Sequence, residues 1–329
     1  MKKIFFKWFA IIFPLLIGVT IIYYQFNSLT INEIENIKLS FRKANYNYIY
    51  FSLIFSILGY WLRAYRWKFS LIHMGYRTKF ANNFATVCIS YLVNLTIPRS
   101  GEISRAALLK KYENVPFDKG FGTIIAERIV DFLIFLIFVL IGFISQFETL
   151  YKFLLDRNVS FKSILIFAII GFLLFIAFVL IWINSQWKIV LKLKKKLSGL
   201  TEGLFSVYKM ENKYSYIVYS FLIWICYFIM FYITIFALPE TANLSFSVVI
   251  MGFIFGSLAV GFTNGGLGAF PLSIALIFSL YGISNQDGTA FGWLVWVSQT
   301  LFTIAMGLIS YLILPIQNKD YSPKYNYKH

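Results

Sequence analysis

The sequence predicts an all-α integral membrane protein with six full transmembrane helices and two re-entrant or broken-helix hairpins, arranged as an inverted-topology repeat. Three observations predict this class: the composition, the spacing of apolar segments, and the placement of basic residues between them. Of 329 residues, 59% are hydrophobic and 13% are charged, whereas soluble domains average about 25% charged residues. So few charges cannot cover a soluble surface of this size, which excludes a soluble multidomain enzyme.

Six segments are apolar enough to cross a bilayer as a helix, which takes about 20 residues. The first of them is longer than the apolar part of a signal peptide and has no A-x-A site after it, so we expect a retained helix. The six segments are Phe5–Tyr24, Asn47–Phe69, Phe121–Ser145, Phe161–Asn184, Tyr214–Ala237 and Ala290–Leu314.

Two further apolar regions contain a break, which gives about eight hydrophobic segments in total. Phe80–Ile97 ends at Pro98 and is followed by a short amphipathic stretch that reaches Lys111. Phe246–Phe262 ends in a glycine-rich turn, and a second apolar stretch then reaches Tyr281. Two short helices around a break are typical of re-entrant hairpins and discontinuous helices. Eight ordinary helices, two of them poor, are the alternative.

The basic residues predict the orientation of the chain. Five segments that would share one side hold 23 of the 30 Lys and Arg residues, and two segments on the other side hold 6. Because Lys and Arg concentrate in cytoplasmic loops, both termini are predicted in the cytoplasm of a multi-pass protein of the cell (inner or cytoplasmic) membrane. The five segments are 1–7, 63–79, 99–119, 188–213 and 315–329, and the two are 25–46 and 146–162.

This topology is consistent with the charge distribution if each hairpin enters and leaves the membrane on the same side, the first from the cytoplasm and the second from the outside. A single membrane domain, 1–329, then contains two halves of opposite orientation, at about 5–145 and about 161–314. Inverted repeats with broken helices are an architecture of secondary transporters. Between the halves, 186–213 is predicted to be a basic amphipathic cytoplasmic linker that binds anionic lipid or a purely topogenic loop. Residues 315–329 are predicted to be a cytoplasmic tail.

Charged side chains at membrane depth usually face a partner or a wet cavity, because each costs at least about 2.5 kcal/mol to insert. Glu127, Arg128 and Asp131 open the third full helix. Glu127 and Asp131 share one helix face, and Arg128 is spaced to pair with Asp131. This cluster predicts either a proton or head-group site, or an ion-paired structural lock near the cytoplasmic interface.

A second cluster surrounds the first break. Ser100 is predicted to cap the helix that follows, and Gly101 to permit the turn. That helix N-terminus, together with two arginines, suits a phosphate; the alternative is that both arginines snorkel to the interface. The candidate ligands of this cluster are Asn94, Arg99, Glu102 and Arg105.

The second break has the sequence Asn264-Gly265-Gly266-Leu267-Gly268. The three glycines allow the chain to reverse and a ligand to approach the backbone, and Pro271 fits the first turn of the next helix. The motif lacks the lysine and the spacing of an ATP-binding loop. Close helix packing through small residues is the alternative.

Arg63 lies in an aromatic and basic stretch, Tyr60–Lys68, at the end of the second helix. Such a stretch is typical of an interfacial anchor, but Arg63 lies deeper than Lys68 and could reach the cavity. No catalytic set, metal-ligand spacing or cofactor motif occurs in the sequence, and the lone His73 supports neither. A net charge of +16 would suggest nucleic acid in a soluble protein; here it fits topology and anionic lipid at the cytoplasmic face.

Together these residues resemble the flippase-like transmembrane region of the lysylphosphatidylglycerol synthase/flippase family, over nearly the whole chain. The resemblance implies a lipid-translocating domain that moves aminoacylated phosphatidylglycerol or other polar lipids between leaflets. It also implies a stand-alone member without the soluble synthase domain. Family members often have Pro before and Glu after the glycine motif, where this chain has Asn264 and Phe270-Pro271. The motifs that carry the resemblance are Arg63-Ala64-Tyr65-Arg66-Trp67, Asn94 with Pro98, Arg99, Gly101, Glu102 and Arg105, the Glu127-Arg128-Asp131 set, and Gly265-Gly266-Leu267-Gly268.

We therefore expect a polar-lipid flippase or transporter, and not an enzyme, that moves an anionic or aminoacylated phospholipid or a lipid-linked precursor. One alternative is a membrane enzyme acting on a lipid-phosphate substrate, with Glu102, Glu127 or Asp131 as acid or base. Another is a non-catalytic scaffold of an envelope-synthesis complex. The predicted head-group ligands are Arg63, Asn94, Arg99, Glu102, Arg105, Glu127, Arg128, Asp131, Asn264, Gly265, Gly266 and Gly268.

Overall fold

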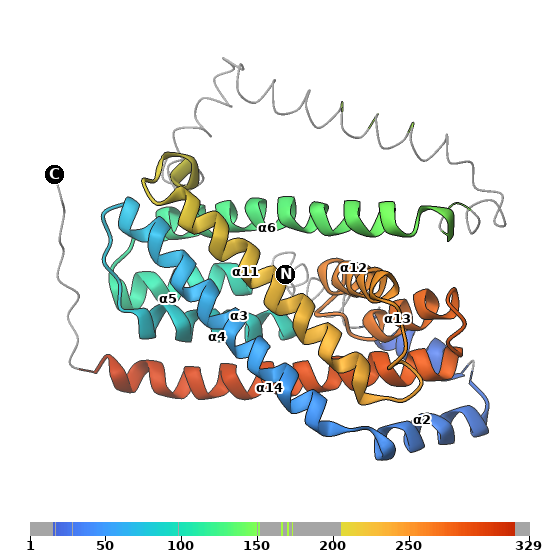
Figure 1. Cartoon of the computed structure of the whole chain (residues 1–329). Helices are drawn as coiled ribbons and strands as arrows, with labels where there is room; N and C mark the ends of the chain where they lie inside the picture. The colour runs from blue at the N-terminus through green and yellow to red at the C-terminus, as the bar shows by residue number, and fades with distance from the viewer. Residues whose placement is uncertain are drawn as a thin grey trace, which may run out of the picture.

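The computed structural model describes residues 16, 18–27, 29–97, 99–149, 151, 166, 170, 173 and 205–319. Across these residues all regular secondary structure is helical and no strand occurs, which confirms the all-α class (Figure 1). Several sequence predictions lie outside the described residues. They are Pro98, the tail from residue 320, the linker up to residue 204, the span Phe161–Asn184 apart from isolated positions, and most of the span Phe5–Tyr24.

Four predicted spans each lie within one continuous helical segment. Two of these segments, α11 with the short 3-10 turn η1 (Lys213–Ala237) and α14 (Asn285–Gln317), are long and apolar enough by composition to cross a membrane. The other two, α3 and α6, have 28 and 29 residues. At 1.5 Å per residue each is about 42 Å long. The bounds of the helices are α2 (Ile31–Lys43), α3 (Tyr46–His73), α4 (Phe80–Thr96), α5 (Gly101–Glu113), α6 (Phe117–Ser145), α11 (Lys213–Thr234), η1 (Ile235–Ala237), α12 (Phe246–Phe262), α13 (Ala269–Ser279) and α14 (Asn285–Gln317).

The two broken regions form helical hairpins. In the first, the backbone N–H of Lys79, just before α4, donates to Glu113 at the end of α5, with 3.0 Å between N and Oε1. The outer ends of α4 and α5 therefore lie side by side. In the second, α12 and α13 are so close that a Cβ on Gly252 would come 2.6 Å from the ring of Phe278. These helices have 17, 13, 17 and 11 residues, less than the roughly 20 needed to cross a bilayer.

The hairpins lie at opposite ends of the molecule and their tips meet in its middle. In Figure 1, α4 and α5 occupy one end and α12 and α13 the other, while α6 and α14 run past both and α3 and α11 run side by side diagonally across the view. At the tips, Asn264 Nδ2 donates to the carbonyl of Leu95 across 3.0 Å. The Arg99 guanidinium donates to the carbonyl of Gly261. The two breaks therefore contact each other directly.

Small residues bring α13 against α14. A Cβ on Gly292 would come 2.6 Å from Pro271 Cα, and one on Gly288 would come 2.8 Å from Ala275 Cα. These two glycines are four residues apart and share one face of α14. Small residues at this spacing let helix backbones approach closely, as in packed membrane helices.

Large apolar side chains cover the outside of the long helices. On α6, Phe132, Leu133 and Leu140 are 58%, 55% and 57% exposed. On α14, Leu308 and Leu312 are 50% and 64% exposed. Monomeric soluble proteins rarely expose contiguous apolar patches above a few hundred Å². Apolar sides on helices of this length fit hydrocarbon as the surrounding solvent.

Candidate functional site

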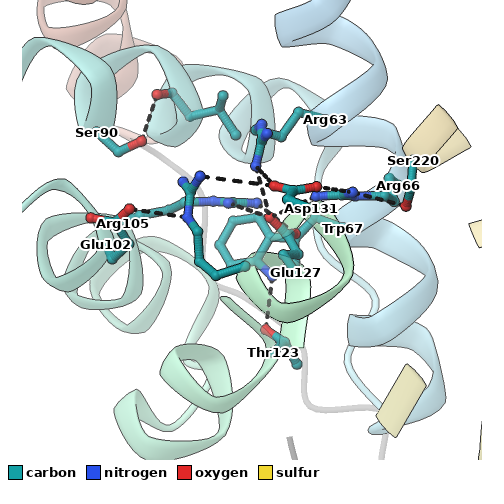
Figure 2. Close-up of polar contacts among 12 residues, drawn as sticks. Arg63, Arg66, Trp67, Ser90, Glu102, Arg105, Thr123, Glu127, Asp131 and Ser220 are labelled. Atoms are coloured by element: carbon teal, nitrogen blue, oxygen red, sulfur yellow. Dashed lines mark hydrogen bonds and ion pairs between the residues drawn. The ribbon is translucent and has the colours of Figure 1, made fainter. Parts of the chain in front are cut away.

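A buried network of ion pairs connects three helices beside the meeting point of the hairpins (Figure 2). Arg63 and Arg66 come from α3, Arg105 from α5, and Glu127 and Asp131 from α6. Asp131 pairs with Arg66 at 2.6 Å and with Arg63 at 2.9 Å. Glu127 contacts Arg105 at 2.8 Å, Arg66 at 3.4 Å and Arg63 at 3.6 Å. Three guanidiniums therefore share two carboxylates.

The sequence places these groups on matching helix faces. Arg63 and Arg66 are three residues apart and Glu127 and Asp131 are four apart, so each pair shares one face of its helix. Aromatic and hydroxyl groups then hold the arginines in place. The guanidinium of Arg105 lies 3.6 Å from the ring centroid of Trp67, whose indole N–H donates to Thr123 Oγ1 at 2.8 Å. Arg66 also donates to Ser220 Oγ at 2.8 Å.

This network has the structure of a lock, because its charges are mostly out of reach of solvent. The side chains of Glu127 and Arg66 are 0% exposed, and that of Arg105 is 2% exposed. Desolvating a charge costs several kcal/mol, and removing one partner of a buried pair leaves the other uncompensated. Arg105 and Glu127 therefore connect α5 to α6.

A second ion pair is partly open. Arg128 Nε lies 3.1 Å from Glu102 Oε1, and the two side chains are 36% and 15% exposed. Arg128 also lies 3.8 Å from Asp131, the spacing expected from the sequence. The other oxygen of Glu102 accepts a long hydrogen bond from Asn94, at 3.4 Å. These side chains connect the buried network to the first break.

The first break differs from the prediction in two details. Ser100 occupies the position before α5, but its hydroxyl donates to the Ile97 carbonyl and caps nothing. Asn94 caps α5 instead: its Oδ1 accepts from the Gly101 N–H at 2.7 Å. Gly101 has a helical conformation and is needed for space, because a Cβ there would overlap the Ser90 carbonyl. The left-handed residue of the turn is Arg99, with φ of 60°.

The second break follows the prediction more closely. Gly265, Gly266 and Gly268 have φ of 63°, 80° and 69°, a region that side-chain-bearing residues rarely adopt. Pro271 lies in the first turn of α13, as expected. The carbonyl of Gly265 accepts from Trp296 Nε1 at 2.8 Å. Gly268 packs against another helix, since a Cβ there would come 2.9 Å from the Gly18 carbonyl.

A cavity of about 450 Å³ lies between the two hairpins and the crossing helices. One part of its wall is charged, and the rest is aromatic and aliphatic with a few hydroxyl and amide groups. Of the predicted ligands, those that line it are Arg63, Asn94, Arg99, Glu102, Arg128, Asp131 and Gly265. Those that do not are Arg105 and Glu127, in the buried network, and Asn264, Gly266 and Gly268, in the packed turn. Their binding role stays a prediction.

Several residues of the site were absent from the predicted set. Tyr91 and Tyr227 share a 2.9 Å hydrogen bond in the cavity wall, and Gln299 accepts from Ser56 at 2.8 Å. Arg66 carried a usable signal, because it lies three residues after Arg63. Tyr227 and Gln299 belong to long apolar spans, where one polar residue gives no indication of which way it faces. In the described part of the chain, no group of three or more His, Cys, Asp or Glu residues could hold a metal ion.

Comparison with known proteins finds two relatives, one of them described as a membrane protein. The chain is 35% identical over 100 residues to the UPF0104 membrane protein MJ1595 of Methanocaldococcus jannaschii, covering 30% of each. It is 33% identical over 78 residues to glycosyltransferase AglD of Haloferax volcanii, covering 23% of this chain and 12% of AglD. The chain thus covers less than a third of either relative. No solved structure matches it.

The family match is much longer than these pairwise matches. It extends over residues 11–307 of the 329. It includes both hairpins, the buried network and every residue that lines the cavity. The chain therefore belongs to the family of the lysylphosphatidylglycerol synthase TM region.

Proposed function

We propose that this protein is a polar-lipid flippase or transporter that moves an anionic or aminoacylated phospholipid, or a lipid-linked precursor, between the leaflets of the cell membrane. The observation that carries the proposal is the cavity at the meeting point of the two hairpins. Its charged part holds Arg99, Arg128 and Glu102, and its apolar part holds Phe231 and Phe253. A phospholipid likewise combines a charged head group with apolar acyl chains.

The size of the cavity fits a head group. Small-molecule sites typically have volumes of about 300–1,000 Å³, and this one has about 450 Å³. Two acyl chains would remain in the bilayer, beside the exposed apolar helices. The charged residues would offset the loss of hydration when a head group leaves the aqueous interface, which is the main barrier to unassisted movement across hydrocarbon.

The hairpins supply a route across the membrane in this proposal. We take α4–α5 to be re-entrant from the cytoplasm and α12–α13 from the outside, as halves of an inverted repeat with both termini in the cytoplasm. Their tips meet at the cavity through Asn264 and Arg99. Movement of either hairpin would open the cavity to one side. A membrane potential would contribute roughly 2.3 kcal/mol per 100 mV for each net charge moved.

We also propose that the protein is not an enzyme. Both carboxylates that line the cavity are paired with arginines: Glu102 with Arg128 at 3.1 Å, and Asp131 with Arg66 at 2.6 Å. A general acid or base must exchange a proton with its substrate, and in the described part of the cavity wall no unpaired carboxylate is available for this.

The test uses purified protein in liposomes that contain a trace of fluorescent phosphatidylglycerol, with dithionite to bleach the outer leaflet. Protein-free liposomes should bleach to about half, and active protein should expose the inner pool. The double variant Arg99→Gln/Arg128→Gln should slow this exposure at least about tenfold, because two charge-assisted contacts are lost.

The matched control is Arg77→Gln, a substitution of an exposed arginine between α3 and α4. Equal bleaching with and without protein, for several head groups, would reject transport; a new lipid product would indicate an enzyme.

A further inference from the structure

We infer that the cavity selects lipids whose head groups carry a net negative charge, with Arg99 and Arg128 binding the phosphate, and that it disfavours aminoacylated head groups with a net positive charge. This inference rests on the proposed function and narrows its substrate class. Three independent features of the cavity wall support it: its net charge, the pairing of its carboxylates, and the type of hydrogen-bonding groups left without partners.

The net charge of the cavity wall is positive. Among the described residues that line it, three arginines (Arg63, Arg99 and Arg128) face two carboxylates (Glu102 and Asp131), a balance of one positive charge. Directly behind them, Arg66 and Arg105 outnumber Glu127 by one more. In a site of low dielectric such an excess attracts an anion and repels a cation more strongly than it would in water.

Neither carboxylate is available to an incoming ammonium group. Asp131 is held by two arginines of α3, at 2.6 Å and 2.9 Å. Glu102 is held by Arg128 at 3.1 Å and contacts Asn94 at 3.4 Å. A lysyl or alanyl head group would therefore need to displace an arginine and leave that guanidinium without a partner, which is costly in a buried site.

Arg99, in contrast to the two carboxylates, is available to an incoming ligand. It forms no ion pair within the described residues, and its guanidinium donates to the Gly261 carbonyl. It is exposed, lies at the tip of one hairpin and touches the other. An anion bound there would contact both hairpins at once. An arginine can also bind two oxygens of a phosphate through parallel N–H groups.

The hydrogen-bonding groups without partners on cavity-lining residues are mostly donors. Trp224 Nε1 and Gln299 Nε2 are buried and have no hydrogen-bond partner in the part of the chain that the structure describes. Asp131 Oδ2 is the corresponding acceptor, but it lies 2.9 Å from Arg63 Nη1. Phosphate oxygens accept hydrogen bonds, whereas ammonium groups donate them. Donors without partners therefore favour a phosphate ligand.

These contacts also suggest how the ligand would enter. Arg128 is the more exposed member of its pair, and Glu102 contacts its Nε, so a lipid phosphate can bind the terminal N–H groups of the guanidinium while the pair stays intact. Glu102 would retain Asn94, which also caps α5 through its other amide atom. The head-group phosphate would then lie between Arg128 and Arg99, and Glu102 would stay paired with Arg128 and unavailable to an ammonium group.

The test measures lipid binding to the full chain in detergent by native mass spectrometry, with equimolar phosphatidylglycerol, phosphatidylethanolamine and lysyl-phosphatidylglycerol. We expect phosphatidylglycerol to be preferred over the lysyl lipid by about tenfold or more, the factor for one charge-assisted contact. Arg99→Glu, an exposed position, should remove or reverse this preference, and Arg77→Glu should leave it unchanged. Equal or better binding of the lysyl lipid, or an unchanged preference in Arg99→Glu, would overturn the inference.

Two further arms separate this inference from the proposed function. The same lipids are compared in the dithionite assay: selective binding of phosphatidylglycerol without translocation would reject transport and leave selectivity intact. Rapid translocation of the lysyl lipid would support transport and reject the selectivity for anionic head groups. Glycerol 3-phosphate serves as a competitor without acyl chains. If it displaces phosphatidylglycerol at equal concentration, the cavity takes a soluble phosphate, and the lipid assignment is wrong.

Discussion

At the scale of single residues, the charged side chains have two different roles. Arg66, Arg105 and Glu127 are buried and connect helices, while Arg99, Arg128 and Glu102 line the cavity. The sequence alone could not separate these roles. Glu127 and Arg128 are neighbours in the chain, yet α6 turns one toward Arg105 and the other toward the cavity. Only the packing of α3 and α5 against α6 decides which charge is desolvated.

This separation predicts different stabilities for two similar variants. Glu127→Gln should lower the free energy of unfolding by about 3–5 kcal/mol, because three buried arginine contacts lose their anion. Glu102→Gln should cost about 1 kcal/mol or less, since that pair is partly exposed. The measurement is denaturant unfolding of the purified protein in mixed micelles. Equal losses in the two variants would contradict the separation.

A second residue-scale prediction concerns Gly101. Gly101→Ala should destabilise the protein by roughly 1–3 kcal/mol, because its methyl group would overlap the Ser90 carbonyl and the Asn94 amide that caps α5. Gly261→Ala is the matched control. It lies at the end of α12, and no described residue comes within 4 Å of an added Cβ, so it should be neutral or slightly stabilising. Thermal unfolding of both variants checks the prediction, and a neutral Gly101→Ala would show that α5 does not approach α4 this closely.

At the scale of elements, the sequence best predicts those features that depend on residues close together in the chain. Four spans follow directly from apolar length, and the glycine turn follows from φ values that other residues avoid. The cap of α5 was predicted wrongly, because Ser100 precedes the helix as a capping residue should, but Asn94 reaches the same N–H from α4. Contacts between elements, such as that of Asn264 with Leu95, depend on how hairpins meet and have no local signal.

The start of α2 is determined by a short sequence pattern. Thr30 and Glu33 form a reciprocal capping box: Glu33 N–H donates to the Thr30 hydroxyl oxygen, and the Thr30 N–H donates to the Glu33 carboxylate at 2.7 Å. Donation from the Thr30 backbone and hydroxyl holds the pKa of Glu33 below its ordinary value of 4.5. Because this pKa is lowered on folding, ionised Glu33 stabilises the start of α2. This stabilisation is complete above the unfolded-state pKa and is lost as pH falls through the folded-state pKa.

We therefore expect the start of α2 to loosen as pH drops below about 4, the region under the reference pKa of glutamate. Hydrogen exchange of the first-turn amides, corrected for intrinsic rates, should show protection that decreases with acid. Glu33→Gln keeps an uncharged acceptor at the same position, so its protection should be independent of pH over this range. A pH-dependent loss of equal size in Glu33→Gln would assign the effect to another group.

At the scale of the whole molecule, the proposal depends on hairpins that enter from opposite faces. The ends of α4 and α5 lie together, with Lys79 bonded to Glu113, so Arg77→Cys and Lys111→Cys should be labelled by an impermeant maleimide from the same side. Glu240→Cys and Asn285→Cys flank α12–α13 and should both be labelled from the other side. All four positions are exposed. Right-side-out and inverted membrane vesicles provide the two faces.

The pattern of labelling distinguishes the candidate topologies, because each topology predicts a different set of cysteines that react from the same face of the membrane. If Arg77→Cys and Lys111→Cys react from opposite faces, α4–α5 crosses the bilayer once as a single broken span and is not re-entrant. If all four positions react from one face, the hairpins are both re-entrant but not inverted, and a head group in the cavity would have one entrance and no exit. Opposite labelling of the two pairs is the result that transport through this cavity requires, since the meeting point of the tips then connects the two sides.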